Sequence, residues 1–377
     1  MAVQQRLESL DALRGLDLFF LVGLEGVLHP LSRAVEAPWF KSFMWNFTHV
    51  EWEGFSPWDL VMPLFLFMAG VSIPFALGRS KGAADNTPVY RRIGRRFVLL
   101  WLFGMMCQGN LLGLDPSHLY LYSNTLQTIA VGYVIAALLF LHTSWKTQSG
   151  IALALLLAYW AALEGISVDG FGGGDYTPDG NLAEWVDRTV LGRFRDGATV
   201  DASGAVVFAP WYRYTWLLSS GNFGVTVLSG CLAGQLLRHP SVPPVRKAVL
   251  LLLIGAALVA AGWLWHLELP VIKKLWTSSM VLVSSGYCFL LMGLSYYWID
   301  CRRHRKGLGW LKVYGMNSIT AYMLASCVSF SSVSRSLLYG FEQYTGSFYP
   351  VLIAAANSLL LFGLLYVLYR NKLFLKV

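Results

Sequence analysis

The chain has 377 residues, of which 56% are hydrophobic and 13% are charged, and its mean hydropathy is +0.52. A soluble domain carries about 25% charged residues, and one core of this size could not bury so much apolar surface. The composition therefore excludes an ordinary soluble protein and indicates an all-α polytopic membrane protein. The net charge of +8 reflects basic residues in short loops between apolar runs. This pattern is typical of membrane topology, and we expect no nucleic-acid partner.

Apolar runs long enough to cross a bilayer follow one another along the chain. A transmembrane helix needs about 20 predominantly apolar residues. The qualifying runs predict about ten such helices, with limits near 10–30, 57–77, 93–113, 121–141, 149–164, 215–237, 247–266, 276–298, 308–330 and 348–369. The fifth run is short, so its sequence alone leaves open whether that span is complete.

The basic residues predict the orientation of these helices. The loop after the second run holds Arg79, Lys81 and four arginines between positions 91 and 96, and five more basic residues lie within 302–312. Cytoplasmic loops carry the excess of Lys and Arg, so both termini are expected in the cytoplasm. A Gly-rich, acidic segment at about 165–214 then forms an extracytoplasmic cap on a single domain of residues 1–377.

Polar side chains inside six of the runs lie mostly in the outer half of the bilayer. A polar side chain is costly in hydrocarbon, and an isolated one in a transmembrane helix usually forms a hydrogen bond to a neighbouring helix. Six runs that are polar on the same side favour a shared hydrophilic cavity that opens to the outside. The side chains are Glu25, Gln108, Asn110, Asn124, Gln127, Asn222, residues 277–279 preceded by Lys273 and Lys274, and Asn317 near the midplane.

The segment HVEWEGFSPWDLVMP contains His49, which Glu51, Glu53 and Asp59 follow within ten residues. A carboxylate beside an imidazole orients the ring, fixes its tautomer and raises its basicity, as a general base or an acyl-accepting nucleophile requires. The alternative is a surface histidine near lipid headgroups in a solvated acidic loop. The sequence has no H-x-x-x-H spacing, no P-loop and no G-x-S-x-G, so we expect no metal site, ATPase or serine hydrolase.

Seven segments carry a resemblance to a known family. RLESLDALRGLDLFFLVG precedes the His49 segment, and RRIGRRFVLLWLFG, NTLQTIAVGY, FGVTVLSGCLAG, KKLWTSSMVLVSSG and YGMNSITAYM follow it. In this order, from residue 6 to about 325, the sequence resembles the heparan-α-glucosaminide N-acetyltransferase family and its bacterial relatives. The resemblance implies that acetyl-CoA is the cytoplasmic co-substrate. The acceptor it implies is the amine of a glucosamine-type sugar at the opposite face of the membrane.

The resemblance also implies roles for individual residues. His49 takes the place of the family's proposed active histidine, and we expect Asp59 and Glu25 to complete the catalytic set. The expected CoA-binding residues are Arg91, Arg92, Arg95, Arg96 and Asn317. Arginines suit phosphates, although the positive-inside rule explains these four as well. The expected acceptor-binding residues are Glu51, Trp52, Asn124, Gln127, Asn222, Lys274 and Trp276.

Two positions depart from the family pattern and leave the acceptor open. Glu25 stands where asparagine is common, and Thr128 follows Gln127 where the lysosomal enzyme has arginine. A sugar transporter, an O-acyltransferase of cell-envelope glycans and a non-enzymatic membrane scaffold are therefore the alternative functions. A homodimer is compatible with the sequence. The expected location is the bacterial cytoplasmic membrane, with membrane lipid as the solvent.

Overall fold

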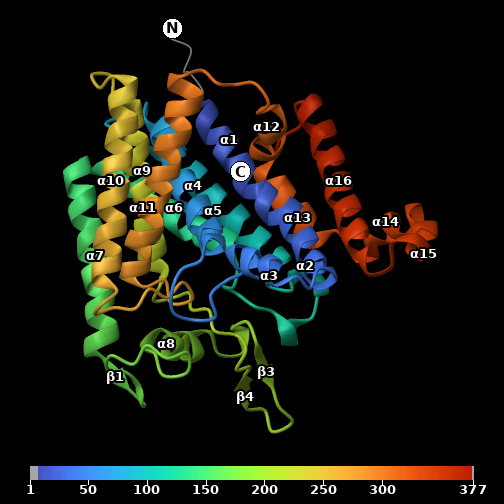
Figure 1. The fold of residues 1–377 in the computed structure, drawn as a ribbon. Helices are drawn as coiled ribbons and strands as arrows, with labels where there is room; N and C mark the ends of the chain where they lie inside the picture. Colours follow the sequence, from blue (N-terminus) through green and yellow to red (C-terminus); the bar gives the residue numbers. More distant parts are fainter. Residues whose placement is uncertain (1–6, 376–377) are drawn as a thin grey trace. The chain divides into compact units, whose positions relative to one another are not determined.

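The computed structural model describes residues 7–375, which are mostly helical (Figure 1). Within residues 7–375, seven helical stretches are long and apolar enough to cross a membrane, judged by length and composition. They are Glu8–Ala34, Pro57–Leu77, Thr125–His142, Trp145–Gly165, Pro244–Trp265, Ser278–Cys301 and Tyr339–Arg370. The chain is therefore a multi-pass membrane protein, as its composition predicted.

Two of the predicted runs form long helices that are more polar than these seven. The run at 93–113 overlaps α5, Thr87–Cys107, whose four arginines lie in its first three turns. The run at 215–237 overlaps α9, Ser220–Arg238, in which polar residues such as Asn222 lower the mean hydropathy. Both helices have about 20 residues and the length to span a bilayer.

The predicted run at 308–330 is not one continuous helix. It is divided at Asn317 into α12, Gly309–Met316, and α13, Ser318–Cys327. The count of about ten spans therefore stays a prediction. The fifth predicted run, by contrast, is a complete helix of 21 residues, α7, Trp145–Gly165.

The described residues form two compact units, and each is treated by itself. The first unit comprises residues 7–49, 56–61 and 291–375, and the second comprises 50–55 and 62–290. That the whole chain is a single functional domain stays a prediction.

The first unit is built around the helix that begins the described chain. This helix runs through α1, a π-helical segment η1 and α2, and α1 packs against α12 while α2 packs against α16. Asp300 accepts hydrogen bonds from the backbone amides of Glu8 and Ser9, which lie at the start of α1 and have no partner within the helix. The elements are α1 (Glu8–Leu18), η1 (Phe19–Leu24), α2 (Glu25–Ala34), α3 (Pro38–Met44), η2 (Trp45–Phe47), η3 (Pro57–Leu60), η7 (Tyr296–Cys301), α12, α13, α14 (Ser331–Leu337), η8 (Tyr339–Phe341), α15 (Glu342–Thr345), η9 (Gly346–Phe348) and α16 (Tyr349–Arg370).

The second unit is a helical bundle in which α9 packs against α6 and α7. Polar N-caps start three of its helices, because Asn124, Ser144 and Asn181 each accept a backbone amide of the following turn. Its helices are α4 (Val61–Leu77), α5, η4 (Leu111–Gly113), η5 (Pro116–His118), α6 (Thr125–His142), α7, α8 (Leu182–Leu191), η6 (Gly192–Phe194), α9, α10 (Pro244–Trp265) and α11 (Ser278–Ser295).

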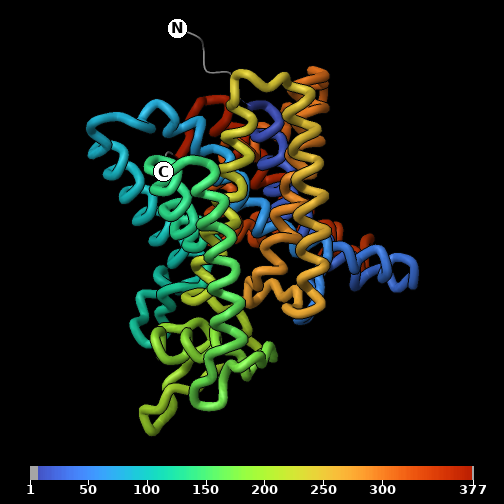
Figure 2. Tube along the Cα trace, turned by 90° about the vertical axis from the view of Figure 1, so that its left-hand side faces the viewer, coloured from blue at the N-terminus to red at the C-terminus, as the bar shows by residue number. Residues whose placement is uncertain are grey.

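The predicted cap segment at 165–214 lies at one end of the helices of the second unit (Figures 1 and 2). It contains α8 and two antiparallel hairpins, β1 (Ser167–Val168) with β2 (Phe171–Gly172) and β3 (Ala198–Val200) with β4 (Val206–Phe208). In the first hairpin Ser167 pairs with Gly172, and in the second Thr199 pairs with Val207. Among the described residues, sheet is confined to these hairpins.

Glycines let α4 and α9 approach each other at backbone distance. A β-carbon at Gly70 of α4 would overlap the carbonyl oxygen of Val227, and one at Gly230 of α9 would overlap that of Phe67. Small residues at such crossings are typical of membrane helices, where close packing replaces the hydrophobic effect. This contact therefore depends on the absence of two side chains.

We expect Gly70→Ala to destabilise the protein by roughly 1–3 kcal/mol, because the added methyl group must push α9 away. Thermal unfolding of the purified protein in detergent measures the effect. Gly94→Ala is the matched control, since a β-carbon at Gly94 of α5 meets nothing within 4 Å. Equal melting temperatures for the two variants would contradict the close crossing of α4 and α9.

Candidate functional site

The first unit contains a histidine–carboxylate pair that joins two segments of the predicted site. His49 Nδ1 lies 2.7 Å from Asp59 Oδ1. The side chain of Asp59 is 1% exposed, whereas that of His49 is 41% exposed. The carboxylate is thus enclosed by protein while the imidazole reaches the surface of the unit.

Local sequence fixes the position of Asp59. Ser56 is the N-cap of η3, and Pro57 is its first residue. Proline suits this position because the first backbone amide of a helix has no acceptor within the helix. Asp59 Oδ2 accepts the backbone amide of Ser56 at 3.0 Å, which is the reciprocal bond of a capping box. Ser56 Oγ lies 2.6 Å from the carbonyl oxygen of Thr48, so Ser56 also holds the residue that precedes His49.

Aromatic packing supports the same turn from within the first unit. Trp58 is 4% exposed, and its ring lies 5.6 Å from that of Phe47 and 6.4 Å from that of Phe20. Trp58, which directly precedes Asp59, is therefore packed between two aromatic rings of the first unit. Such packing keeps the carboxylate from rotating away from the imidazole.

The pairing decides what the imidazole can do. A carboxylate that accepts from Nδ1–H selects the tautomer in which Nε2 is the basic nitrogen, and it stabilises the imidazolium that forms when Nε2 takes a proton. A buried carboxylate does this more strongly than a solvated one, because the local dielectric is lower. The pair is chemically suited to a general base or a nucleophile.

Glu25, the third predicted catalytic residue, opens α2 directly after the π-helical segment η1. Its recorded partner is His29 one turn later, with 3.8 Å between His29 Nε2 and Glu25 Oε1. Glu25 shares the first unit with His49 and Asp59, but the ion pair described for it is with His29. Its catalytic role stays a prediction.

The arginines predicted to bind CoA lie in the first turns of α5, in the second unit. Arg91, Arg92 and Arg95 are exposed. Arg96 is half-buried, and its guanidinium lies 4.1 Å from the centre of the Tyr133 ring. Three of the four arginines are thus open to an anionic ligand, while the fourth is held against α6.

Asn317, also predicted to bind CoA, lies in the first unit at the break between α12 and α13. Its Nδ2 donates to the carbonyl oxygens of Val313 at 2.9 Å and Leu365 at 3.4 Å. The residue thereby ties α12 to α16. Its buried Oδ1 accepts no hydrogen bond from the described residues.

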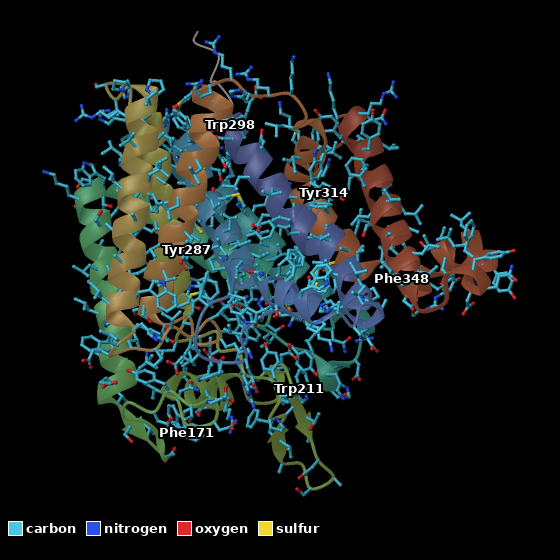
Figure 3. All side chains as sticks on the ribbon, in the orientation of Figure 1. Phe171, Trp211, Tyr287, Trp298, Tyr314 and Phe348 are labelled. Carbon is cyan, nitrogen blue, oxygen red and sulfur yellow. The ribbon has the colours of Figure 1, made fainter. Side chains whose placement is uncertain are left out.

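Three of the predicted acceptor-binding residues, Glu51, Trp52 and Lys274, come together in two linked segments of the second unit. Lys274 Nζ donates to the Glu51 carbonyl oxygen at 2.6 Å, and Trp52 Nε1 donates to that of Tyr176 at 2.9 Å. The backbone amide of Gly54 donates to Val271, so residues 50–55 lie along residues 271–274. Phe55 stacks on Tyr287 of α11, with 5.7 Å between ring centres. Tyr287 is labelled in Figure 3.

Trp276 and Asn222 join each other rather than facing solvent. Asn222 Nδ2 donates to the Trp276 carbonyl oxygen at 2.9 Å, and Trp276 Nε1 donates to Thr226 Oγ1 at 3.1 Å. Trp276 is 1% exposed and packs edge-on against Phe223. These contacts bond α9 to the start of α11, and a role of either residue in sugar binding stays a prediction.

Asn124 and Gln127 build the start of α6. Asn124 Oδ1 accepts from the Leu126 amide, and Gln127 Oε1 accepts from the amides of Ser123 and Asn124. Asn124 Nδ2 lies 3.4 Å from Gln108 Oε1, and Gln108 Nε2 donates to Asp196. The polar groups therefore form a chain from α6 to the cap segment. The outward-facing cavity that they were expected to line stays a prediction.

Sequence reasoning missed a buried charge cluster in the cap segment. Glu184 of α8 binds Arg195 and Arg188, each at 2.6 Å, and Arg195 is fully buried. Asp187 of the same helix accepts the backbone amides of Trp216 and Leu217 at 2.7 and 3.0 Å. This cluster fastens the cap to the segment that leads into α9. Its charges are spaced one helical turn apart in LAEWVDR, but their Arg195 partner is not visible from the sequence.

Ser56 is the other residue that sequence reasoning missed, although a signal exists. Ser56, Pro57 and Asp59 match the spacing of a capping box with proline at the first helical position.

Residues 7–375 contain no group of three or more His, Cys, Asp or Glu side chains arranged to hold a metal ion.

Comparison with known proteins supports the resemblance found in the sequence. A family model described as Domain of unknown function (DUF5009) matches residues 6–172. The chain is also similar to heparan-alpha-glucosaminide N-acetyltransferase of Homo sapiens, with 24% identity over 421 aligned residues. This alignment covers 100% of the chain and 60% of that relative, so the chain spans about three fifths of its length. The predicted resemblance is confirmed along the whole chain.

The stability of the cap segment is expected to depend on pH through Asp187. Burial raises the pKa of Asp187 to about 7, whereas an unfolded aspartate titrates near pH ~3.9. Between these values the folded chain binds the extra proton, so stability is full below pH ~4 and falls as the pH rises towards 7. Asp187→Asn cannot ionise, and we expect it to flatten this decline in thermal unfolding measured from pH 4 to 8.

Asp201→Asn is the control, because Asp201 lies in the same segment but is fully exposed. Hydrogen bonds from Ser203 and Ala205 lower the pKa of Asp201, so its removal should not flatten the decline. Parallel curves for the wild type and Asp187→Asn would mean that Asp187 is already ionised in the folded protein.

Proposed function

We propose that the protein is a transmembrane acyltransferase that moves the acetyl group of acetyl-CoA to the amine of a glucosamine-type sugar. The observation that carries this proposal is the His49–Asp59 pair, with a 2.7 Å bond between a half-exposed imidazole and a buried carboxylate. The similarity to an N-acetyltransferase over the whole chain supports the reaction class. His49 is the catalytic residue, and Asp59 positions it.

The reaction forms one N–C bond and breaks one C–S bond. The acceptor amine attacks the thioester carbonyl, the thiolate of CoA leaves, and the nitrogen loses a proton. His49 Nε2 accepts that proton and returns it to the thiolate, while Asp59 stabilises the imidazolium in between. Holding donor and acceptor together in a site shielded from water supplies the proximity that the reaction needs.

The same pair also suits a two-step route in which His49 first accepts the acetyl group. The two routes differ in a measurable way. A two-step enzyme incubated with labelled acetyl-CoA alone retains the label on the protein, while a ternary-complex enzyme does not. Asp59 orients the ring in both routes.

The exposed arginines of α5 are the proposed site for the phosphates of CoA. Arg91, Arg92 and Arg95 lie within two turns, and a guanidinium binds a phosphate through two parallel hydrogen bonds. Asn317 is the further residue that we assign to CoA. On the acceptor side we propose Glu51, Trp52 and Lys274.

We propose that both termini and the start of α5 face the cytoplasm, and that His49 and the cap segment face the outside of a bacterial cytoplasmic membrane. The distribution of Lys and Arg supports this orientation. Acetyl-CoA then reaches the protein from the cytoplasm, and the acceptor from outside.

We expect His49→Ala to lower acetyl transfer by roughly 10²–10⁴-fold, the usual contribution of general acid–base catalysis. Asp59→Asn should fall in the same range, because an amide cannot stabilise the imidazolium. Transfer of radiolabelled acetyl from acetyl-CoA to glucosamine by the purified protein measures the effect. CoA binding and thermal unfolding are measured in parallel to show that each variant is folded.

His118→Ala is the matched control, because it removes a pair of the same geometry. His118 Nδ1 also lies 2.7 Å from a carboxylate, Asp115 Oδ2, but both side chains are about half exposed. Full activity in a folded His49→Ala variant would refute the catalytic assignment. If the protein neither bound CoA nor released CoA with any amino sugar, the proposed acetyltransferase activity would be refuted.

The orientation is tested separately in a background without native cysteines. We expect His49→Cys to react with a membrane-impermeant thiol reagent applied outside intact cells. Arg92→Cys should react only when the cytoplasmic face is opened. Labelling of His49→Cys from the cytoplasmic face alone would reverse the proposed topology.

A further inference from the structure

The second unit contains a large groove whose walls are membrane-spanning helices. Its volume is about 1040 Å³, which is at the upper end of ligand pockets. Residues of α7 such as Leu153 line one wall, and Ile254 and Leu258 of α10 line the other. The floor is formed by α9 and α11, with Leu232 among the residues that line it.

The groove is apolar along most of its lining, and its walls are accessible from outside the protein. Leu153 is 56% exposed and Ile254 is 39% exposed. Both belong to helices that are apolar enough to cross a bilayer. The medium around these walls is therefore hydrocarbon, and an occupant must have an apolar part of its own.

One end of the groove is basic. Lys81, Arg238 and His239 line this end, and the described lining residues include no Asp or Glu. Lys81 follows α4, and the other two lie where α9 ends. The groove thus combines a long apolar surface with a cluster of cationic groups at a helix end.

The two strongest cations are held in place but keep donors to spare. Lys81 Nζ donates to the Thr143 carbonyl oxygen at 2.9 Å and lies 4.6 Å from the centre of the Phe140 ring. Arg238 Nη1 donates to the Pro74 carbonyl oxygen. An ammonium has three donors and a guanidinium five, so one bond each leaves capacity for an anion. Partial burial lowers the pKa of Lys81, and a neighbouring anion would favour its charged form.

We propose that this groove binds an anionic phospholipid, with an acyl chain along α7 and α10 and the phosphate at Lys81, Arg238 and His239. A soluble anion alone would leave the apolar surface uncovered. A zwitterionic lipid would bring an ammonium group to an end that offers it no carboxylate. Basic pockets between membrane helices are a recurring way to hold anionic headgroups.

Photo-crosslinking of the full chain tests the proposal. The purified protein is reconstituted with phosphatidylglycerol that carries a photoreactive acyl chain, or with phosphatidylcholine that carries the same chain, and the crosslinked peptides are mapped. We expect phosphatidylglycerol to label the groove faces of α7 and α10 severalfold more than phosphatidylcholine. Lys81→Gln should lower that preference by roughly fivefold, the contribution of one full charge. Adding His239→Gln should lower it further, because a second group that can carry a positive charge beside the phosphate is lost.

Filling the groove supplies the matched control. Leu153→Trp should lower labelling, whereas Leu157→Trp, one turn along the same helix, should not. Leu157 is 43% exposed and does not line the groove. Equal labelling by the two lipids, or equal effects of the two tryptophans, would overturn the proposal. Loss of labelling in the presence of inorganic phosphate would show a site for the anion alone and would also overturn it.

Discussion

Both oxygens of the Asp59 carboxylate are committed inside the first unit, and the rest of the candidate site depends on this. Oδ2 accepts the amide that starts η3, and Oδ1 pairs with His49 Nδ1. One buried group therefore closes a helix start and orients an imidazole ten residues earlier. A buried carboxylate without such partners would cost several kcal/mol, so both bonds stabilise the loop arrangement in which Asp59 pairs with Nδ1 of His49.

Burial, not distance, separates this pair from its counterpart in the second unit. His118 and Asp115 lie equally close, but the Asp115 side chain is 47% exposed whereas that of Asp59 is 1% exposed. Water screens the exposed pair and competes for its hydrogen bonds. In the enclosed pair the carboxylate therefore acts on the imidazole with less screening. The distance alone therefore does not distinguish the two pairs.

The sequence predicted the membrane class, and it predicted that a nearby carboxylate, Glu51, Glu53 or Asp59, would orient His49, because both depend on residues close together in the chain. The structure identifies Asp59 as the partner. The sequence did not predict the break at Asn317, since an average over about 20 residues does not register one residue that leaves the helical conformation. It also did not reveal that Asn124, Gln127 and Asn222 bond backbone groups. An amide that caps a helix and one that lines a cavity look the same in a linear pattern. The pairing of Glu184 with Arg195 was hidden for a related reason, because their contact depends on how the cap segment folds.

These contacts divide the predicted site residues by what each could give to a substrate. The side-chain oxygen of Gln127 can accept from a ligand only by releasing the amides at the start of α6, and an unsatisfied buried amide costs roughly 1–3 kcal/mol. The Asp59 bond, by contrast, is made to Nδ1 of His49 and favours the tautomer in which Nε2 is the basic nitrogen. The exposed arginines of α5 likewise point their charges to solvent without capping any helix. The roles proposed for His49 and for the exposed arginines of α5 therefore require no helix cap to be broken, whereas a ligand at Asn124 or Gln127 would compete with backbone amides.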